Sequence, residues 1–285
     1  MVDQDLPPTP TLNDSVIWGV VASLTILVNS IQIHILRNIV KRKAHETLLL
    51  SFSICTLLTG IFGFFTVTLT SIRGIKIHFY TIWAFFGIMY AYLSLVSILH
   101  LIIISISRLW DVACPLHNRS LENDRKQPIR ISILSWCVPM TFISGYIVVI
   151  QIKVLDIYGI IHYNRRVLAS ILAVFVLVAD LVFLVCYSII SAIIFDSRKY
   201  TKSRRQTHMM RTLLLCVGFA FIFITCTTPF VITTISDWNK SVWLDKTSIG
   251  LLLLKGIMYP SIYLAHKCRL RFLKRKRVKP IWTRK

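Results

Sequence analysis

Three charged residues, Arg108, Asp180 and Lys255, stand within or at the edge of long apolar stretches of this chain. A charge at the centre of a bilayer costs about 2.5–3.5 kcal/mol on insertion scales, so it usually pairs with another group or faces a wet cavity. Arg108 closes its apolar run and can reach the headgroups at little cost. Asp180 and Lys255 lie deeper. Either they only contact a neighbouring helix or water, or they serve a binding or switching role.

The sequence offers no arrangement of residues that is typical of catalysis. It contains no His-Glu-x-x-His pair for zinc, no glycine-rich phosphate loop and no nucleophile elbow, and its eight histidines are scattered. We therefore predict that the protein is not an enzyme and that it has no cofactor and no metal site.

The composition indicates a single domain embedded in a membrane. Hydrophobic residues make up 55% of the 285 residues and charged residues only 16%, whereas a soluble domain carries about 25% charged residues. The net charge of +21 could indicate nucleic-acid binding, but that would need a basic face on a soluble fold. Here the basic residues lie in short clusters between apolar runs, so we predict no nucleic-acid partner.

Seven apolar stretches approach or exceed the roughly 20 residues that a spanning helix needs. They are residues 16–37, 47–72, 79–107, 129–152, 167–195, 210–235 and 247–265. The predicted fold class is therefore an all-α membrane protein, a seven-transmembrane helix bundle. Its domains would be an extracellular segment at 1–15, the seven-span domain at 16–265 and a basic cytoplasmic tail at 266–285.

The distribution of Lys and Arg predicts the orientation of this bundle. The segments after the first, third and fifth spans, the basic tail and the adjoining helix ends hold 25 of the 33 basic residues, and the other side holds eight. The positive-inside rule places the richer set in the cytoplasm. The N-terminus is then outside and the C-terminus inside, in a multi-pass protein of the plasma membrane.

Possible modification sites agree with this orientation. Asn13 and Asn239 are glycosylation acceptors that fall outside, whereas Asn118 matches the same tripeptide inside, where it should stay unused. All seven cysteines fall in spans or on the cytoplasmic side, so we predict no extracellular disulfide.

Several short motifs, in order along the chain, resemble those of rhodopsin-like (class A) G-protein-coupled receptors. In "SRLWDVACPL", Arg108 and the proline seven residues later resemble that family's Asp-Arg-Tyr and Pro-Leu pattern. The further matches are Asn29, Trp136, Tyr187, Phe223 with "CTTPF" at 226–230, and "YPSIY" at 259–263. The resemblance covers nearly the whole chain and identifies it as a divergent member of the family.

The resemblance implies a switch at the cytoplasmic end. Arg108, Tyr187 and Tyr263 would meet when the sixth helix swings outward, and they would line a cleft that accepts a G protein. Pro229 and Pro260 would kink the sixth and seventh spans. The alternative for the tyrosines is interfacial anchoring, and for the prolines a static kink.

The chain also departs from the family pattern. Ser107 replaces the acid before Arg108, Thr56 the sodium-binding Asp of the second span, and Tyr259 the Asn of the seventh. Further departures are Thr227 in place of the sixth-span Trp and Trp83 in place of the disulfide Cys. We therefore expect no sodium regulation, no switch at residue 227 and no acid adjacent to Arg108.

Lys255 could occupy roughly the place that the sodium ion takes in other members of the family. Our hypothesis is that it faces inward near Thr56, and the alternative is that it only packs against another helix or water. It is not a retinal-binding lysine, because the opsin position aligns with Leu253.

The resemblance places a ligand pocket at Tyr90, Ser94, Phe230 and Thr234. Tyr90 stands where amine receptors carry an Asp, so we do not expect a cationic amine as the ligand. A small molecule or a short peptide is expected instead, as for a chemoreceptor.

The tail from Lys267 to Lys285 mixes apolar and basic residues. It predicts a short amphipathic helix after the seventh span that binds anionic inner-leaflet lipids, with Cys268 as a palmitoylation candidate. The alternative is a disordered basic tail.

The predicted function is reception of an extracellular ligand and signalling to a heterotrimeric G protein. One alternative keeps the receptor fold without ligand-driven signalling, as a decoy or a partner subunit. A seven-span transporter or channel is a further alternative, although few polar residues lie inside the spans.

Overall fold

The structure is a computed structural model that describes residues 12–39, 44–71, 79–114, 126–153, 157–198, 217–218, 221–229, 231–232, 254–265 and 267. All regular elements among these residues are helices. The five long ones are α1 (Leu12–Arg37), α2 (Ala44–Ser71), α3 (Phe79–Ala113), α5 (Gln127–Lys153) and α6 (Ile157–Arg198). Shorter helical segments at 221–229 and 254–265 belong to the predicted sixth and seventh spans.

Four of the described helices are long and apolar enough to cross a membrane. The candidate spans are Ser15–Arg37, Glu46–Thr68, Ile88–Ala113 and Ser170–Asp196. They fall on the first, second, third and fifth predicted stretches, so these four predictions are confirmed in position.

Two helix ends differ from the prediction by six residues or more. Helix α3 continues to Ala113, past the expected end at 107, and α6 begins at Ile157, before the expected start at 167. Hydropathy shows where the apolar stretch of a helix ends. The helix itself can continue further, until it meets a residue such as proline that disfavours helical backbone. Pro115 disfavours helical backbone in the preceding residue and explains the end of α3. Arg108 therefore lies inside a helix, not at its end.

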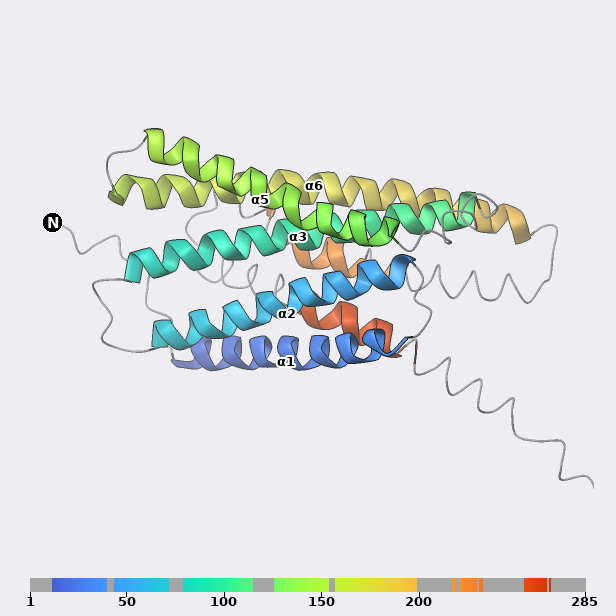
Figure 1. The fold of residues 1–285 in the computed structure, drawn as a ribbon, viewed down its shortest axis with the longest axis horizontal. Helices are drawn as coiled ribbons and strands as arrows, with labels where there is room; N and C mark the ends of the chain where they lie inside the picture. Colours follow the sequence, from blue (N-terminus) through green and yellow to red (C-terminus); the bar gives the residue numbers. More distant parts are fainter. Residues whose placement is uncertain are drawn as a thin grey trace, which may run out of the picture.

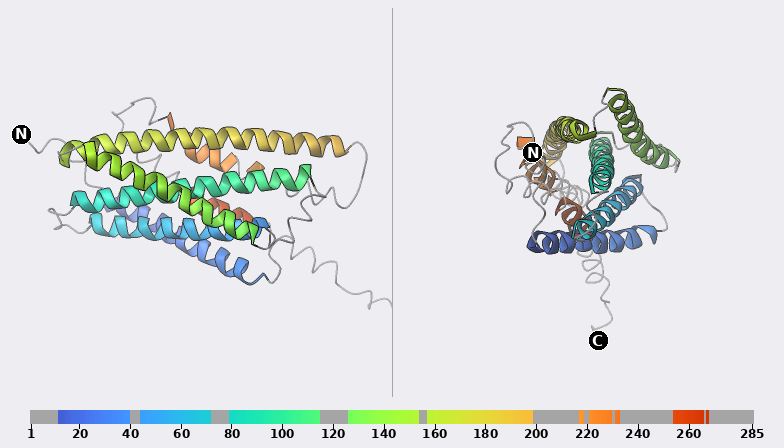
Figure 2. Two further views of the ribbon diagram at one scale, coloured as in Figure 1. Left: turned by 45° about the horizontal axis from the view of Figure 1, so that its top comes forward. Right: turned by 90° about the vertical axis from the view of Figure 1, so that its left-hand side faces the viewer.

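Successive long helices run in opposite directions, as Figure 1 shows. Helix α2 packs against α1, α3 and α5, and α3 also packs against α5 and α6. The right panel of Figure 2, viewed along the bundle, shows α3 surrounded by other helices. Because the third helix touches so many neighbours, side chains on it can connect distant parts of the chain.

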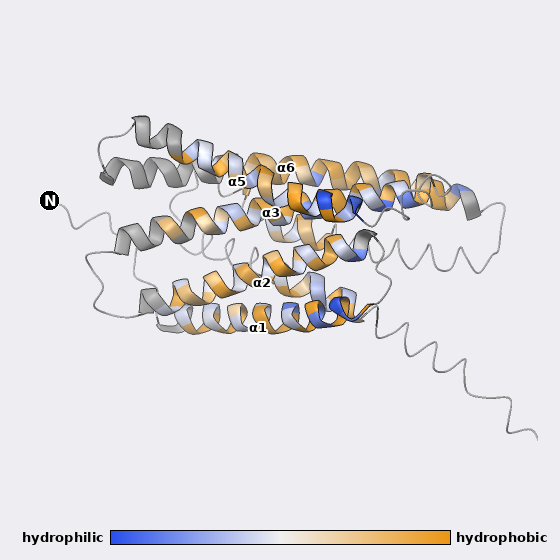
Figure 3. Ribbon diagram, in the orientation of Figure 1, coloured by the Kyte–Doolittle hydropathy of each residue, from blue (hydrophilic) through white to orange (hydrophobic). Residues whose placement is uncertain are grey.

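The interior of the bundle is apolar with a few polar side chains, and its outer surface is also apolar. Helix α6 turns a row of large hydrophobic side chains outward: Val174, Leu177, Val178, Leu181, Leu184 and Val185. A helix that is hydrophobic on all sides suits a lipid environment. Figure 3 shows apolar residues along the middle of the helices and hydrophilic ones where α1 and α3 end and α5 begins. We call this the basic end, after Arg37, Arg108 and Arg130.

Candidate functional site

Arg108, near the basic end of α3, is paired with an acid. Its Nη1 atom lies 3.8 Å from Asp111 Oδ2, one helical turn further on, and both side chains are partly exposed. Ser107 stands where the family has its acid, as expected, but Arg108 still has an acidic partner, because residues three apart share one face of a helix. An exposed pair of this kind is worth at most about 1 kcal/mol. It restrains Arg108 only loosely.

Tyr187 connects α6 to α3 close to Arg108. Its hydroxyl lies 2.9 Å from the hydroxyl of Ser105, one turn before Arg108. Its ring stacks on Phe183, whose ring meets that of Phe223 edge-on, with centroids 4.8 Å apart. The tyrosine predicted for the switch is thus held between a serine on α3 and an aromatic cluster that reaches the sixth span.

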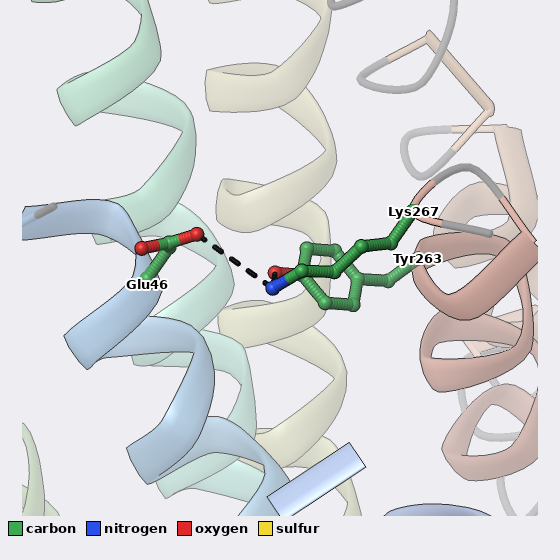
Figure 4. A network of polar contacts seen from close by, with 3 residues as sticks. All are labelled: Glu46, Tyr263 and Lys267. Carbon is green, nitrogen blue, oxygen red and sulfur yellow. Dashed lines mark hydrogen bonds and ion pairs between the residues drawn. The ribbon is translucent and has the colours of Figure 1, made fainter. Parts of the chain in front are cut away.

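Tyr263 is held by a polar contact between the start of α2 and the end of the seventh span (Figure 4). Lys267 Nζ donates a hydrogen bond to Tyr263 Oη at 3.2 Å and lies over the tyrosine ring, 5.4 Å from its centroid. The same Nζ is 3.9 Å from Glu46 Oε1 in the first turn of α2. We call Glu46, Tyr263 and Lys267 the lysine clasp. Each of the three predicted switch residues is therefore bound to a different neighbour.

Pro229 and Pro260 lie in the sixth and seventh spans, where a proline interrupts the backbone hydrogen bonds of a helix. Before Pro229, the hydroxyl of Thr227 donates to the carbonyl of Phe223 at 2.7 Å and that of Thr228 to Ile224 at 2.6 Å. Pro260 lies buried in the segment 254–265. A proline leaves the carbonyl four residues earlier without its helical donor. Both prolines thus fall where a spanning helix has lost a backbone hydrogen bond.

A buried polar contact joins α1, α2 and the segment 254–265. Asn29 Nδ2 donates to the carbonyls of Thr25, at 2.8 Å, and of Gly256, at 2.9 Å. Thr56 Oγ1 donates to Asn29 Oδ1 at 2.5 Å. A Cβ on Gly256 would lie 3.2 Å from Thr25 Cγ2, so glycine permits this close approach.

Next to this contact lies a small cavity with a volume of about 20 Å³. We call it the lysine cavity. Its lining residues come from α1, α2, α3 and the segment 254–265: Thr25, Thr56, Thr59, Tyr90, Ser94, Ser97, Lys255 and Gly256. The structure therefore brings Lys255 and Thr56 to one cavity, together with two of the four residues predicted for the ligand pocket.

Lys255 and Asp180 are the two charged side chains predicted within spans. Lys255 Nζ is buried without a hydrogen-bond partner among the described residues and lies over the ring of Phe223, 5.5 Å from its centroid. Asp180 Oδ1, on α6, is likewise buried without a hydrogen bond to the described residues. Within the described part of the chain, the two side chains do not form an ion pair.

His100 organises a second buried polar network on α3. Trp136 Nε1 donates to Ser51 Oγ at 2.8 Å, and Ser51 Oγ lies 2.8 Å from His100 Nε2. His100 Nδ1 lies 2.8 Å from the carbonyl of Val96, which assigns the ring proton to Nδ1 and leaves Nε2 as the acceptor. Ser135 Oγ approaches Nε2 at 2.9 Å. This network ties α2, α3 and α5 together.

The comparison with known families decides the identity of this bundle. A profile of the family described as 7 transmembrane receptor (rhodopsin family) matches residues 30–258, which is more than half of the chain. The chain belongs to this family. Among curated proteins, no match is found.

The receptor is therefore a multi-pass membrane protein of a signal-transducing family, not of an enzyme family. Most of the contacts of Arg108, Tyr187, Lys255 and His100 lie within the matched part of the receptor. Tyr263 and Lys267 follow directly after it.

Some predicted sites of the receptor lie outside the described residues. They are Phe230 and Thr234 of the ligand pocket, the acceptor Asn239, the tail residue Cys268 and the side chains of Asn13 and Trp83.

Other residues of the site could not be singled out in the sequence. Glu46 and Lys267 are opposite charges at the predicted cytoplasmic ends of two spans, which is a weak signal for a pair. Asp111 stands at helical spacing from Arg108, a signal that becomes visible once α3 is known to continue.

Proposed function

We propose that this receptor transmits an extracellular ligand signal to a heterotrimeric G protein at its basic end, through an outward swing of the sixth span. The proposal rests mainly on the arrangement of Arg108, Tyr187 and Tyr263. All three lie towards the basic end, and each contacts a different polar residue: Arg108 contacts Asp111, Tyr187 contacts Ser105 and Tyr263 contacts Lys267. The ion pairs of Arg108 with Asp111 and of Lys267 with Glu46 are partly exposed, so these groups can exchange partners at modest cost. The hydrogen bond between Tyr187 and Ser105 is buried, so Tyr187 needs a new polar partner when it leaves Ser105.

The direction of signalling follows from the charge distribution. The basic end carries Arg37, Arg108 and Arg130, and the positive-inside rule places it in the cytoplasm of a plasma-membrane receptor. The N-terminus, with Asn13, and the loop with Asn239 are then extracellular and open to glycosylation. The tail binds anionic inner-leaflet lipids, with Cys268 as a palmitoylation site.

The movement has a structural basis in the aromatic cluster. Phe223 of the sixth span meets Phe183, and Phe183 stacks on Tyr187. A displacement of the sixth span therefore acts on Tyr187 and its hydrogen bond to Ser105. The extracellular ligand, a small molecule or a short peptide, would act from the side of Tyr90, Ser94, Phe230 and Thr234.

The deciding experiment compares G-protein activation by the wild type and by Arg108→Ala in cells at matched surface expression. We expect Arg108→Ala to abolish activation, because its guanidinium would contact the G protein. The matched control is Arg130→Ala, an exposed arginine at the same end of the bundle, which should retain activation. Equal, robust signalling by the wild type and Arg108→Ala would contradict the role of Arg108.

One further function has support in the departures from the family pattern. Thr56, Thr227 and Tyr259 replace three family residues that support signalling, and a partner subunit or decoy could dispense with them. No activation by the wild type with any ligand would favour this function. Ion flux without G-protein involvement would favour a channel.

A further inference from the structure

The lysine cavity contains three hydrogen-bond donors that are not used elsewhere in the described structure. Four of its hydroxyl groups are committed: Thr25 donates to Val21, Thr56 to Asn29, Thr59 to Cys55 and Ser97 to Ser94. The hydroxyls of Tyr90 and Ser94 and the ammonium of Lys255 have no hydrogen-bond partner within the described part of the chain. Two of these donors come from α3 and one from the segment 254–265.

The Lys255 ammonium lacks a compensating negative charge at hydrogen-bond distance within the described part of the chain. It is buried, and its contact with Phe223 is a face-on approach to an aromatic ring, 5.5 Å from the centroid. Such contacts offset only part of the cost of burying an ammonium group. Among the described residues, no acidic side chain lines the cavity. A charged lysine here therefore favours an incoming negative group.

The size of the cavity limits what can enter. A volume of about 20 Å³ exceeds the roughly 10–15 Å³ that one water molecule needs, yet it leaves no room for a second small molecule. One compact group fits: a single water, a monatomic ion or the end of a carboxylate. Among these, the three free donors and the uncompensated positive charge select an anion over water or a cation.

We propose that the lysine cavity binds one small negatively charged group, held by the Lys255 ammonium and the hydroxyls of Tyr90 and Ser94. The group is either a free halide ion or the carboxylate of an extracellular ligand, since both present a compact negative charge to the same donors. A free halide would bind whether or not the receptor activates a G protein. A ligand carboxylate would deepen the proposed function by making the receptor selective for acidic ligands.

The test uses the purified full-length protein in lipid nanodiscs and measures its thermal unfolding at constant ionic strength. Sodium chloride, choline chloride, sodium formate and sodium gluconate are compared. A ligand that binds only the folded state raises the melting temperature. We expect a rise of about 5 °C with saturating chloride or formate over gluconate, and no difference between sodium and choline. A rise that follows sodium and not the anion would overturn the proposal.

Variants assign the effect to the cavity. Lys255→Met should lose the anion dependence, and Ser94→Ala and Tyr90→Phe should each weaken the apparent affinity several-fold while keeping the charge. The matched control is Thr59→Ala, because Thr59 lines the same cavity but donates its hydrogen to Cys55. Unchanged anion affinity in both Ser94→Ala and Tyr90→Phe would overturn the proposal even if Lys255→Met failed to fold.

Asp180 supplies the competing explanation, in which it moves to pair with Lys255. Asp180→Asn should strengthen anion binding if the anion is the partner of Lys255, since a nearby negative charge is removed. Loss of the anion response in Asp180→Asn would show that the two residues act together and would count against the proposal. A larger stabilisation by formate than by chloride identifies a ligand carboxylate as the source, and the reverse identifies a free halide.

Discussion

Thr56 on α2 donates a hydrogen bond of 2.5 Å to the side chain of Asn29 on α1. Asn29 also contacts a third helix, because its amide nitrogen donates a hydrogen bond to the carbonyl of Gly256 in the seventh span. Three helices thus share one buried amide. Since a buried polar group that loses its partner costs about 1–3 kcal/mol, this contact is a sensitive point of the bundle.

Replacing Asn29 by Ala should destabilise the receptor by about 2–4 kcal/mol, because the Gly256 carbonyl loses its side-chain donor and Thr56 loses its shortest hydrogen bond. Thermal unfolding in nanodiscs measures the effect. Ser23→Ala is the matched control, since Ser23 is exposed and bonds only within its own helix, to Gly19. A comparable loss of stability in both variants would show that the hydrogen bonds of Asn29 between helices contribute no more than a hydrogen bond within one helix.

Gly256→Ala should lower the melting temperature because the new Cβ would lie 3.2 Å from Thr25 Cγ2, which is tighter than most Cβ contacts, so Thr25 would have to shift. The second change Thr25→Ser removes that methyl group and should restore part of the loss. Gly145→Ala on α5 serves as the control, since among the described residues nothing lies within 4 Å of the position that its Cβ would take. Absence of rescue by Thr25→Ser would argue against steric contact as the cause.

Glu46→Gln should raise basal G-protein activation by up to about fivefold, the equivalent of about 1 kcal/mol for a partly exposed ion pair. The physical reason is that Glu46 pairs with Lys267, and Lys267 donates a hydrogen bond to the Tyr263 hydroxyl, which the proposed active state needs for its contact with Arg108. Nucleotide exchange on a purified G protein measures the effect. In a Lys267→Gln background, Glu46→Gln should raise basal activation little further. If the effects of the two substitutions on basal activation were fully additive, the two residues would act separately.

His100→Ala should destabilise the bundle by about 2–4 kcal/mol, because it opens a cavity and removes the acceptor of Ser51. A double-mutant cycle of His100→Ala with Ser51→Ala, followed by thermal unfolding, should show a coupling of about 1 kcal/mol or more. A coupling energy near zero would show that the histidine acts through packing alone.

The sequence predicted the helical class and the positions of the described spans, because long apolar runs leave few alternatives in a membrane. It misplaced the end of α3, which Pro115 terminates, and the start of α6, because a helix can continue beyond the apolar segment that hydropathy detects. Side-chain partners were the least predictable part. Asp111, Ser105 and Glu46 come to their partners through helix rotation and packing, which hydropathy does not determine.

Lys255 and Thr56 form an intermediate case. Alignment with the family motif predicted that they lie close together, and both line the same cavity. The alignment could not predict which hydroxyl groups around them remain free. Whether a hydroxyl group remains free depends on whether it donates to a backbone carbonyl of its own helix, as the hydroxyls of Thr59 and Ser97 do.

Helix α6 extends over 42 residues, which corresponds to about 63 Å at 1.5 Å per residue. The hydrocarbon core of a bilayer is only about 30 Å thick, and the apolar part of α6 covers Ser170–Asp196. The first 13 residues, 157–169, therefore rise about 20 Å above the membrane-spanning part as one proline-free rod. Any tilt of the helix at Tyr187 is magnified at its far end, so a spectroscopic label near Ile157 would act as a gauge of motion at the opposite face of the membrane.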